Sequence, residues 1–569
     1  MAQCTVHGRM KRRLFLPWCA ISLLAGCSTW SLFSSDKPKE SNDTPDDQPH
    51  TVGDLAIPFG MFPVKLEAVG LVSGLHGTGS DPEPSPQRAM LIAEMQRRGV
   101  ENPNQLLATR NFSLVLVRGF LRPGIQKGDH FDVELRIKDR SETTSLRGGY
   151  LLETHLSDLA VIYNKVLNGK DRAIAQGPVL VDPSATEKVN SAQLGRGVVL
   201  GGGIAHEPRS VGLFLNGAEE TNMTPEQLKN AVVRSAQVAN AINRRFSTHK
   251  HGIKEGVAKA IRGNYVDLVV DPAYKDNLTR YFQVLRAIEL QESPAQTVLR
   301  VAKLKTKLFD PVTSFEATIK LEAIGKPAID VLVEGVQAHD PKVQFYAAEA
   351  LAYLDRREAA EPLGRAAHNA AFRGQALTAL SVMHDSAAYD QLRMLLAVPS
   401  AETRYGAFRA LTVMCPDDSL VKGETLGEQF SYHVLDTKGP PMIHVTRNRR
   451  AEVVLFGLNQ RFLPPLALNA GNQIMITSKH DGEITVSKFV PHEADQQRVV
   501  STRIDDVIRA VVELGGTYPD VVQAFQEAKA AGCLEVDGRF EVDALPEEGR
   551  RYEATTEEDE KPDEETKGE

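Results

Sequence analysis

The side chains that could form a hydrolytic triad lie together in one glycine-rich stretch. Ser73, His76 and Asp81 supply a hydroxyl nucleophile, a base and a carboxylate. Triads are normally assembled by the fold from distant parts of a chain, so we interpret these three residues as parts of a turn. The chain also lacks the His-Glu-x-x-His, Gly-x-Ser-x-Gly and Cys-x-x-Cys patterns. We therefore predict that the protein is not an enzyme and uses no cofactor.

Metal and phosphate binding have equally little support in the sequence. The 15 histidines are scattered without the spacing of metal ligands, and His206 beside Glu207 is more typical of a surface turn. Residues 195–203 are dense in glycine, but the Gly-Lys-Ser or Gly-Lys-Thr of a phosphate-binding loop does not follow them. We predict a tight β turn at 195–203 and no metal site.

Cys27 is the residue whose position most strongly indicates a chemical modification. It follows a basic segment, Lys11–Arg13, and an apolar segment, Leu14–Leu24, and it completes the tetrapeptide Leu24-Ala-Gly-Cys27. This order is typical of a bacterial lipoprotein signal, which is cleaved before the cysteine, and the cysteine thiol then carries the lipid. The alternative is an ordinary secretory signal with an incidental cysteine, and Met10 is an alternative start.

The segment after Cys27 indicates where the protein lies. The residue after the cysteine is Ser28. Aspartate at this position would favour retention in the inner membrane, so the serine indicates the outer membrane. We therefore expect a periplasmic protein anchored to the outer membrane by its lipid. Residues 1–27 are read as the signal peptide and the polar residues 28–50 as a disordered tether. Beyond this terminus no apolar run is long enough to span a bilayer.

Length and charge restrict the remaining possibilities. The 569 residues suffice for three or four domains. The net charge of −8 gives no case for binding nucleic acid, which needs a concentrated basic face. Residues 546–569 are acidic and predict a disordered tail. Cys415 and Cys533 remain in the mature chain, where they either form a disulfide or stay as two separate thiols.

Short alternating segments make up the region that follows the tether. Each alternates apolar and polar residues and ends near Gly, Pro or Asp, which predicts β-strands. These segments cover residues 69–79, 109–118, 128–137, 144–156 and 173–178. A helix is expected to interrupt them at Gln87–Arg98, where apolar residues recur at helical spacing.

The order of motifs in these segments resembles that of the bacterial flagellar P-ring protein family. That family has a GLV-x-GL-x-GTG start, an Asn-led strand, a G-x-x-x-DV strand, an SL-x-GG-x-LL-x-T segment and an AQGP turn. All five occur here in the same order, and the resemblance continues more loosely to about Leu290. The positions that carry it are Gly70, Gly74, Gly77, Thr78, Gly79, Asn111, Asp132, Leu146, Gly148, Gly149, Gln176, Gly177 and Pro178.

The resemblance implies a structural subunit of the flagellar basal body. Such a subunit assembles with copies of itself into a ring around the rod in the periplasm. The implied partners are those copies, the flagellar rod and L-ring proteins, and the peptidoglycan layer. The lipid anchor and a helical repeat, described below, depart from the family pattern. The alternative is therefore an outer-membrane lipoprotein that uses the module as a scaffold or interaction protein outside the flagellum.

Residues 51–300 are expected to form the P-ring-like module, a β-rich α+β domain. Its last part has a capping-box spacing at Thr224–Gln227, which predicts the start of a helix. A strand at Tyr265–Pro272 and an amphipathic helix at Asn277–Leu290 follow. Basic residues on the strands form either a solvated face or a contact for an anionic polymer or a neighbouring subunit. They are Arg118, Arg122, Lys127, Arg136, Lys138 and Arg147.

Residues 311–415 contain an internal repeat. Leu321, Leu351, Leu380 and Leu411 end similar apolar segments about 30 residues apart, and a second helical stretch follows each segment. This spacing predicts a HEAT-like α-solenoid whose helix pairs bury their apolar faces against each other. Such an array either presents a docking surface or serves only as a spacer.

Residues 428–545 predict a β-hairpin-rich α+β domain. A hairpin is expected at Ile474–Phe489, with its turn at Asp481-Gly482, and helices at Asp505–Leu514 and Pro519–Ala531. The predicted fold class is thus multidomain α+β: a β-rich module, an α-solenoid and a second small domain of strands and helices.

Overall fold

The computed structural model describes residues 50–97, 99–139, 141–162, 165–185, 190–215, 224–250, 253–478, 482–491, 493–534 and 539–542. Cys27, the signal peptide, nearly all of the tether and the acidic tail lie outside these residues. The described residues all belong to one of the chain's two compact units, Pro49–Glu569. None of the helices in the described ranges has the length and apolar composition needed to cross a membrane.

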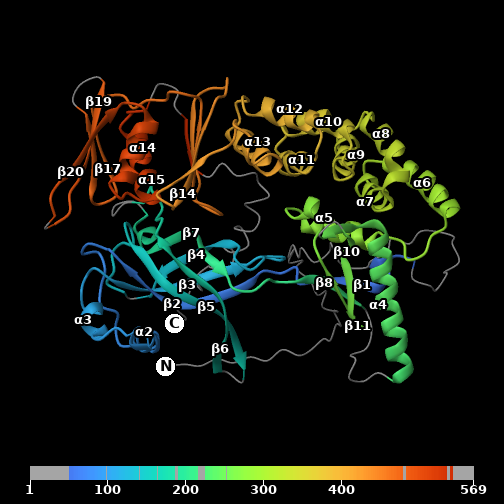
Figure 1. Cartoon of the computed structure of the whole chain (residues 1–569), viewed down its shortest axis with the longest axis horizontal. Helices are drawn as coiled ribbons and strands as arrows, with labels where there is room; N and C mark the ends of the chain where they lie inside the picture. Colours follow the sequence, from blue (N-terminus) through green and yellow to red (C-terminus); the bar gives the residue numbers. More distant parts are fainter. Residues whose placement is uncertain are drawn as a thin grey trace, which may run out of the picture. The chain divides into compact units, whose positions relative to one another are not determined.

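Six antiparallel strands close into a barrel (Figure 1). In their order of pairing they are β2 (Val64–Ser73), β3 (Ser113–Leu121), β4 (His130–Ile137), β7 (Arg196–Ala205), β6 (Lys165–Pro178) and β5 (Tyr150–Ile162). Alternate residues point inward, and Leu66, Val117 and Leu135 are among those that fill the interior. The predicted strands are confirmed, and a 3-10 turn, η2 (Ser191–Gly195), precedes β7.

Two short helices pack on the outside of the barrel. They are α2 (Pro86–Arg97) and α3 (Pro103–Leu107), and α2 confirms the helix predicted at Gln87–Arg98. A small separate core joins them to the barrel, with Leu91 from α2 packed near Leu71 of β2 and Leu114 of β3. The rest of the outer face of β2 and β3 stays accessible.

Residues 196–203 of the glycine-dense range lie in the strand β7, so the prediction of a tight turn there was wrong. The ladder between β7 and β4 is irregular between Phe131 and Val133, and Gly201 has a φ of 62° beside this irregularity. Gly203 leaves room for the ring of Phe131, because a Cβ there would lie 2.7 Å from it. The glycines therefore serve a bulge and close packing inside the barrel.

A second, four-stranded antiparallel sheet follows the barrel along the chain. Its order is β1 (Ala56–Phe59), β8 (Val211–Leu215), β12 (Tyr265–Leu268) and β11 (Ala258–Arg262). Val238 of α4 (Pro225–Arg245) and Tyr281 of α5 (Leu278–Arg286) belong to the core on one of its faces. The predicted capping box between Thr224 and Gln227 is present at the start of α4. Short elements complete this region: α1 (Val52–Leu55), β9 (Ser247–Lys250), β10 (Ile253–Gly256) and η4 (Pro272–Tyr274).

Eight helices form the repeat array, seen in yellow tones in Figure 1. They are α6 (Pro294–Leu308), α7 (Ser314–Ile324), α8 (Ile329–Val336), α9 (Pro341–Tyr353), α10 (Ala360–Ala366), α11 (Arg373–Ser381), α12 (Ser386–Leu395) and α13 (Ala401–Met414), with 3-10 turns η5 (Lys326–Ala328) and η6 (Arg357–Ala359). The array begins one helix earlier than the repeat pattern predicted, because α6 pairs with α7.

The core of the repeats is continuous with that of the four-stranded sheet. One continuous set of buried residues runs from Val52 and Leu213 in the four-stranded sheet to Phe408 in the last repeat. A buried ion cluster lies within it: Arg280 of α5 contacts Glu322 of α7 and Glu349 of α9, each at 2.6 Å. The expectation that the repeats bury their apolar faces only against each other is therefore corrected.

The described residues of the last domain form two sheets and two helices. One sheet has the order β13 (Glu424–Leu426), β14 (Phe430–Leu435), β16 (Glu452–Phe456), β15 (Met442–Val445) and β21 (Arg539–Val542). The other has the order β17 (Leu466–Ala470), β18 (Ile474–Ser478), β19 (Glu483–Lys488) and β20 (Gln496–Ser501). Both predicted helices are present as α14 (Ile504–Glu513) and α15 (Tyr518–Ala530). Cys415 and Cys533 are free thiols, and Asp481 of the predicted hairpin turn lies outside the described residues.

Candidate functional site

Most of the motif residues meet at one end of the barrel, where β2 ends and β3 and β5 begin. The loop after β2 is hydrogen-bonded to the chain before β3: Leu75 N–H donates to Asn111 O at 3.1 Å, and Gly79 N–H donates to Arg110 O at 2.9 Å. Gly74 and Gly77 lie in this loop with φ values of 77° and 98°. We call this region the motif end of the barrel (residues 73–81, 110–113, 143–150 and 177–180).

Thr78 connects this loop to the segment before β5. Its hydroxyl lies 2.9 Å from the carbonyl oxygen of Leu75 and 2.8 Å from that of Ser145. Thr144 N–H donates to the carbonyl oxygen of Thr78 at 2.8 Å. Beside it, the hydroxyl of Thr143 lies 2.9 Å from that of Ser80 and 2.7 Å from that of Ser113. The motif threonine therefore joins the loop after β2 to the segment before β5, and Thr143 adds the start of β3.

Close backbone contact explains two of the motif glycines. A Cβ on Gly79 would lie 2.3 Å from the carbonyl oxygen of Phe112. A Cβ on Gly149 would lie 2.5 Å from Val72 Cγ1 and 2.8 Å from Leu75 Cδ2. Real Cβ atoms do not approach other atoms so closely, so both positions need glycine for the chain segments to pack.

The other motif positions of this end tie β5 to β6 and the loop to the core. Leu146 is buried, its N–H donates to Leu194 O at 2.8 Å, and Gly148 has a φ of 73°. Gly177 and Pro178 are paired with Leu151 and Tyr150 in the ladder between β6 and β5. These residues hold the barrel closed at the motif end.

Three motif residues lie elsewhere in the barrel. Gly70 faces the interior, where a Cβ would lie 2.7 Å from Val117 Cγ2, and Gln176 is exposed on β6. Asp132 accepts hydrogen bonds from the N–H groups of Gly201, at 2.8 Å, and Arg449. Burial raises the pKa of the Asp132 carboxyl, although both hydrogen bonds favour its charged form. The partner Arg449 could not be found from the sequence, because it lies 317 residues away.

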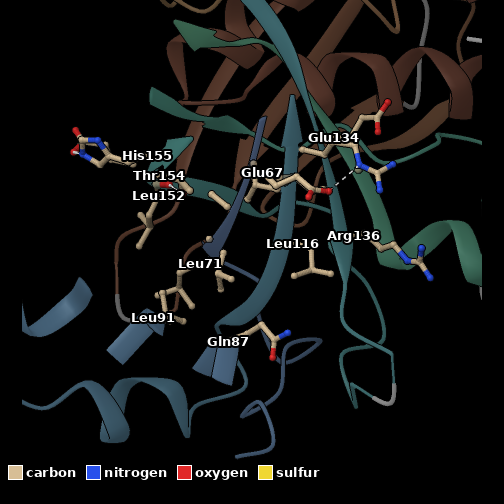
Figure 2. A pocket seen from close by; sticks show the side chains of 18 of the residues that line it. Glu67, Leu71, Gln87, Leu91, Leu116, Glu134, Arg136, Leu152, Thr154 and His155 are labelled. Carbon is tan, nitrogen blue, oxygen red and sulfur yellow. Dashed lines mark hydrogen bonds and ion pairs between the residues drawn. The ribbon is translucent and has the colours of Figure 1, made fainter. Parts of the chain in front are cut away.

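A groove of about 1530 Å³ lies on the outer face of the barrel beside α2 (Figure 2). Leu71, Leu116 and Leu152 reach it from three strands, and Met90 and Leu91 reach it from α2. Leu116, Leu152 and Met90 are 38%, 39% and 49% exposed. The groove therefore offers an accessible apolar strip on an otherwise closed barrel.

Charged side chains border this strip. Glu67 lies 2.7 Å from Lys65 and 3.5 Å from Arg118, and His155 lies 3.6 Å from Asp171. These charges are matched locally, with no nucleophile and base in contact among the lining residues that the structure describes. Such a surface can bind another surface, and its composition of an apolar strip within a charged rim is typical of a protein contact.

The three residues considered as a triad do not come together. The Ser73 hydroxyl donates to Tyr150 O at 3.3 Å, and the Asp81 carboxylate binds Arg88 at 3.1 Å. His76 Nε2 lies 3.3 Å from the side-chain amide of Gln473. Within the described ranges no group of three metal-ligating side chains is positioned to hold a metal ion. Glu207 instead pairs with Lys170, which holds the pKa of that carboxyl below its usual range.

Half of the basic residues predicted on the strands bind groups within the chain, although Arg118 and Arg136 both line the groove. Arg118 pairs with Glu67, and Arg136 pairs with Asp139 at 3.2 Å. Arg147 donates to the carbonyl oxygens of Asp182, at 3.1 Å, and Ala185, at 2.7 Å. Three of the six candidates are thus engaged within the chain, which weakens the hypothesis of a polymer-binding face.

Comparison with known proteins identifies the family. A family model for the flagellar P-ring protein matches residues 52–338, about half of the chain. The chain belongs to the flagellar P-ring protein family. A model for HEAT repeats matches residues 301–412, which confirms the predicted array. The P-ring match extends past the expected end near Leu290 and overlaps the first repeats.

Individual P-ring relatives are distant. The flagellar P-ring protein of Thermotoga maritima is 28% identical over 260 residues, which cover 44% of this chain and 69% of the relative. That of Nitrosospira multiformis is 26% identical over 292 residues, which cover 50% of this chain and 71% of the relative. That of Methylobacillus flagellatus is 29% identical over 257 residues, which cover 44% of this chain and 63% of the relative.

The P-ring match gives the site its context. Residues 52–338 include the whole barrel, the four-stranded sheet and the helices α4 to α8. The motif end therefore belongs to the P-ring part of the chain, as do all the residues that line the groove except Arg447 and Asn448. The helices α9 to α13 and the last domain lie outside that match.

Proposed function

We propose that this chain is a structural subunit of the flagellar basal body that assembles with copies of itself into a closed ring around the rod in the periplasm. Its partners would be those copies, the rod and L-ring proteins and the adjacent peptidoglycan. It has no catalytic role in this proposal. The observation that carries the proposal is the P-ring family match over the same residues that build the barrel and its motif end.

The groove on the barrel is the surface where we place the contact with a neighbouring copy. A closed ring needs a heterologous contact, in which one surface of a subunit meets a different surface of the next. Leu116, Leu152 and Met90 form a partly exposed apolar strip on strands and a helix that the barrel core holds rigid. A charged rim around such a strip favours a defined orientation of the partner.

Charges placed in the groove test this contact. Leu116→Lys combined with Leu152→Lys should lower the mass of the detergent-extracted native complex to that of small oligomers or monomers. Circular dichroism should stay unchanged, because both side chains are more than a third exposed. Met475→Lys on β18, where the side chain is 40% exposed outside the P-ring part, is the matched control. A ring of unchanged mass in the double variant would remove the groove as the contact, and a wild-type monomer would refute the ring.

The lipid anchor is a separate part of the proposal. We infer from the Leu24-Ala-Gly-Cys27 tetrapeptide that Cys27 is acylated and holds each subunit at the outer membrane. Cys27→Ala should abolish incorporation of labelled fatty acid, with Cys533→Ala as the control that keeps it. Equal labelling of the Cys27→Ala protein would show that the lipid is absent or attached elsewhere.

A second candidate function is a lipoprotein scaffold outside the flagellum. The observation that favours it is that residues 339–569 lie beyond the P-ring match. Basal bodies purified from strains with and without this protein separate the two functions. Ring density lost in the deletion strain supports the basal-body role, and unchanged basal bodies support the scaffold.

A further inference from the structure

The helix α6, at one end of the repeat array, has apolar residues on two opposite faces. Leu304 and Leu308 are buried against the neighbouring helices. On the other side Val298 and Leu299 are 68% and 72% exposed. Ala295 and Ala302 are also exposed and extend this stripe at the spacing of one helix face. We call these four residues the outer stripe of α6.

The outer stripe is unusual for the end of a solenoid. The terminal helix of a repeat array normally turns a polar face to solvent, because no further repeat covers it. Here the apolar surface continues past the helix, where Phe309 is 42% exposed and Val312 is 89% exposed. An exposed apolar surface of this kind marks a site of interaction.

The charges of α6 indicate the chemistry of the partner. The helix contains Arg300 and three lysines, Lys303, Lys305 and Lys307, and no acidic residue. Arg300 pairs with Glu289 at 3.2 Å and Glu292 at 2.8 Å, so the lysines carry the basic charge of the helix. On a helical projection Lys303 and Lys305 lie on either side of the outer stripe, roughly 80° from its centre by the 3.6-residue period. Lys305 also contacts Glu334 at 2.5 Å. An apolar stripe between basic residues is typical of helices that lie in the interface of an anionic membrane.

The start of the described chain lies close to α6. Leu290 N–H, just before α6, donates to the carbonyl oxygen of His50 at 2.9 Å. The segment between the proposed lipid site and His50 is residues 28–49, 22 residues whose composition predicts a tether. A flexible chain of that length has an end-to-end distance of about 26 Å. This is comparable to the length of α6, about 22 Å for its 15 residues.

We propose that the outer stripe of α6 lies on an anionic phospholipid surface, with Lys303 and Lys305 at the headgroups. The inference extends the proposed lipid anchor, because the anchored terminus and α6 then meet the same membrane. The stripe itself binds lipid without the acyl chains. A second copy of the chain is the competing occupant of this surface, and it lacks the support that the basic charge and the tether give to a membrane.

Vesicle binding of the mature polypeptide without its lipid, Ser28 to Glu569, tests the proposal. It should sediment with phosphatidylcholine vesicles that contain about one third phosphatidylglycerol, and far less with phosphatidylcholine alone. Val298→Gln with Leu299→Gln should lower the ratio of bound to free protein at least tenfold, since burial of even one of these side chains is worth about tenfold or more. Lys303→Glu should lower binding in the same direction.

A matched variant guards against unspecific effects. Leu228 and Val232 of α4 are 42% and 51% exposed, and Leu228→Gln with Val232→Gln should bind vesicles as the wild type does. Circular dichroism of all variants should be equal, because every changed side chain is largely exposed.

The outcomes separate this inference from the proposed ring. Absence of wild-type binding to anionic vesicles, or equal binding of the Val298→Gln/Leu299→Gln variant, would overturn it. A smaller native complex in that variant with vesicle binding intact would assign the stripe to a second copy and overturn it too. Vesicle binding lost in that variant while the native complex keeps its mass supports it. If the chain binds vesicles through the outer stripe but forms no ring, the membrane inference holds and the ring proposal fails.

Discussion

Replacing Arg280 with methionine would leave two buried carboxylates without their cation. The side chains of Arg280, Glu322 and Glu349 are 4%, 0% and 3% exposed. Tyr274 donates a further hydrogen bond to Glu322 at 2.6 Å, and Arg280 bridges the two acids. Methionine fills much of the same volume, and the change therefore removes charge with little change in packing.

The expected loss of stability follows from burial. Breaking a buried ion pair by removing one partner costs about 3–5 kcal/mol, because the remaining charge stays desolvated. Arg280 has two such partners, so we expect the Arg280→Met variant to lie at the upper end of that range. The control Arg365→Met breaks an exposed pair with Glu361, whose side chains are 60% and 73% exposed. That pair should contribute less than about 1 kcal/mol.

The pH dependence of the variant provides a second test. Without Arg280, a proton taken up by a buried carboxylate removes a charge that has lost its cation, and this relieves the cost of its desolvation. The stability of the folded variant should therefore rise as the pH falls from 7 toward 5. The wild type keeps its cation and serves as the reference at both pH values.

Urea unfolding followed by far-UV circular dichroism measures both effects, because the repeat helices dominate the signal. The midpoint for Arg280→Met should fall well below that of Arg365→Met at pH 7 and recover part of the difference at pH 5. A loss below about 1 kcal/mol, or a loss without recovery at pH 5, would show that the cluster does not bind the sheet to the repeats as a charged unit.

Two further changes probe other parts of the structure. Gly149→Val should destabilise the barrel by about 1–3 kcal/mol and reduce ring assembly, because its Cβ would meet Val72 and Leu75. Thermal unfolding and native mass measure these two effects, and an unchanged melting temperature would contradict the prediction. Burial lowers the pKa of His444 to about 3. The unfolded chain therefore binds a proton at this histidine near pH 6.5, whereas the folded chain does not. The free energy of unfolding should fall by about 2 kcal/mol from pH 7 to pH 5. His444→Phe should remove that fall in urea titrations at the two pH values, and an equal fall in both proteins would refute the assignment.

Local sequence signals predicted the elements of this fold well. Alternation predicted the barrel strands β2 to β6, and the Thr224 to Gln227 spacing predicted the start of α4, because both signals depend on residues adjacent in sequence. The prediction for residues 195–203 was wrong because the sequence does not distinguish a glycine needed for packing from a glycine needed for a turn. Contacts with residues distant in sequence, such as those of Gly203 with Phe131 and of Gly195 with Ile137, distinguish the two.

The residues of the site could be predicted from the sequence, but their position in the fold could not. The motifs identified Thr78, Asn111 and Gly149 without showing that closure of β2 on β5 brings them together. The helix α6 was missed as the first repeat helix because apolar residues on two of its faces hide the helical period. The ion cluster at Arg280 was missed because each of its members is an ordinary charged residue in the sequence.

The repeat array shares a packed core with the P-ring part of the chain and is not a separate appended domain. The P-ring match ends at residue 338, just after α8, yet α8 packs closely on its neighbours: a Cβ on Gly335 would lie 2.9 Å from Ala347 of α9 and from Leu308 of α6. Such close packing allows little sliding between neighbouring repeats. Because Arg280 in turn ties α5 to α7 and α9, the array is locked to the four-stranded sheet. In the proposed ring each array would therefore keep a fixed orientation to its subunit, and a partner held by the array would be held in register with the ring.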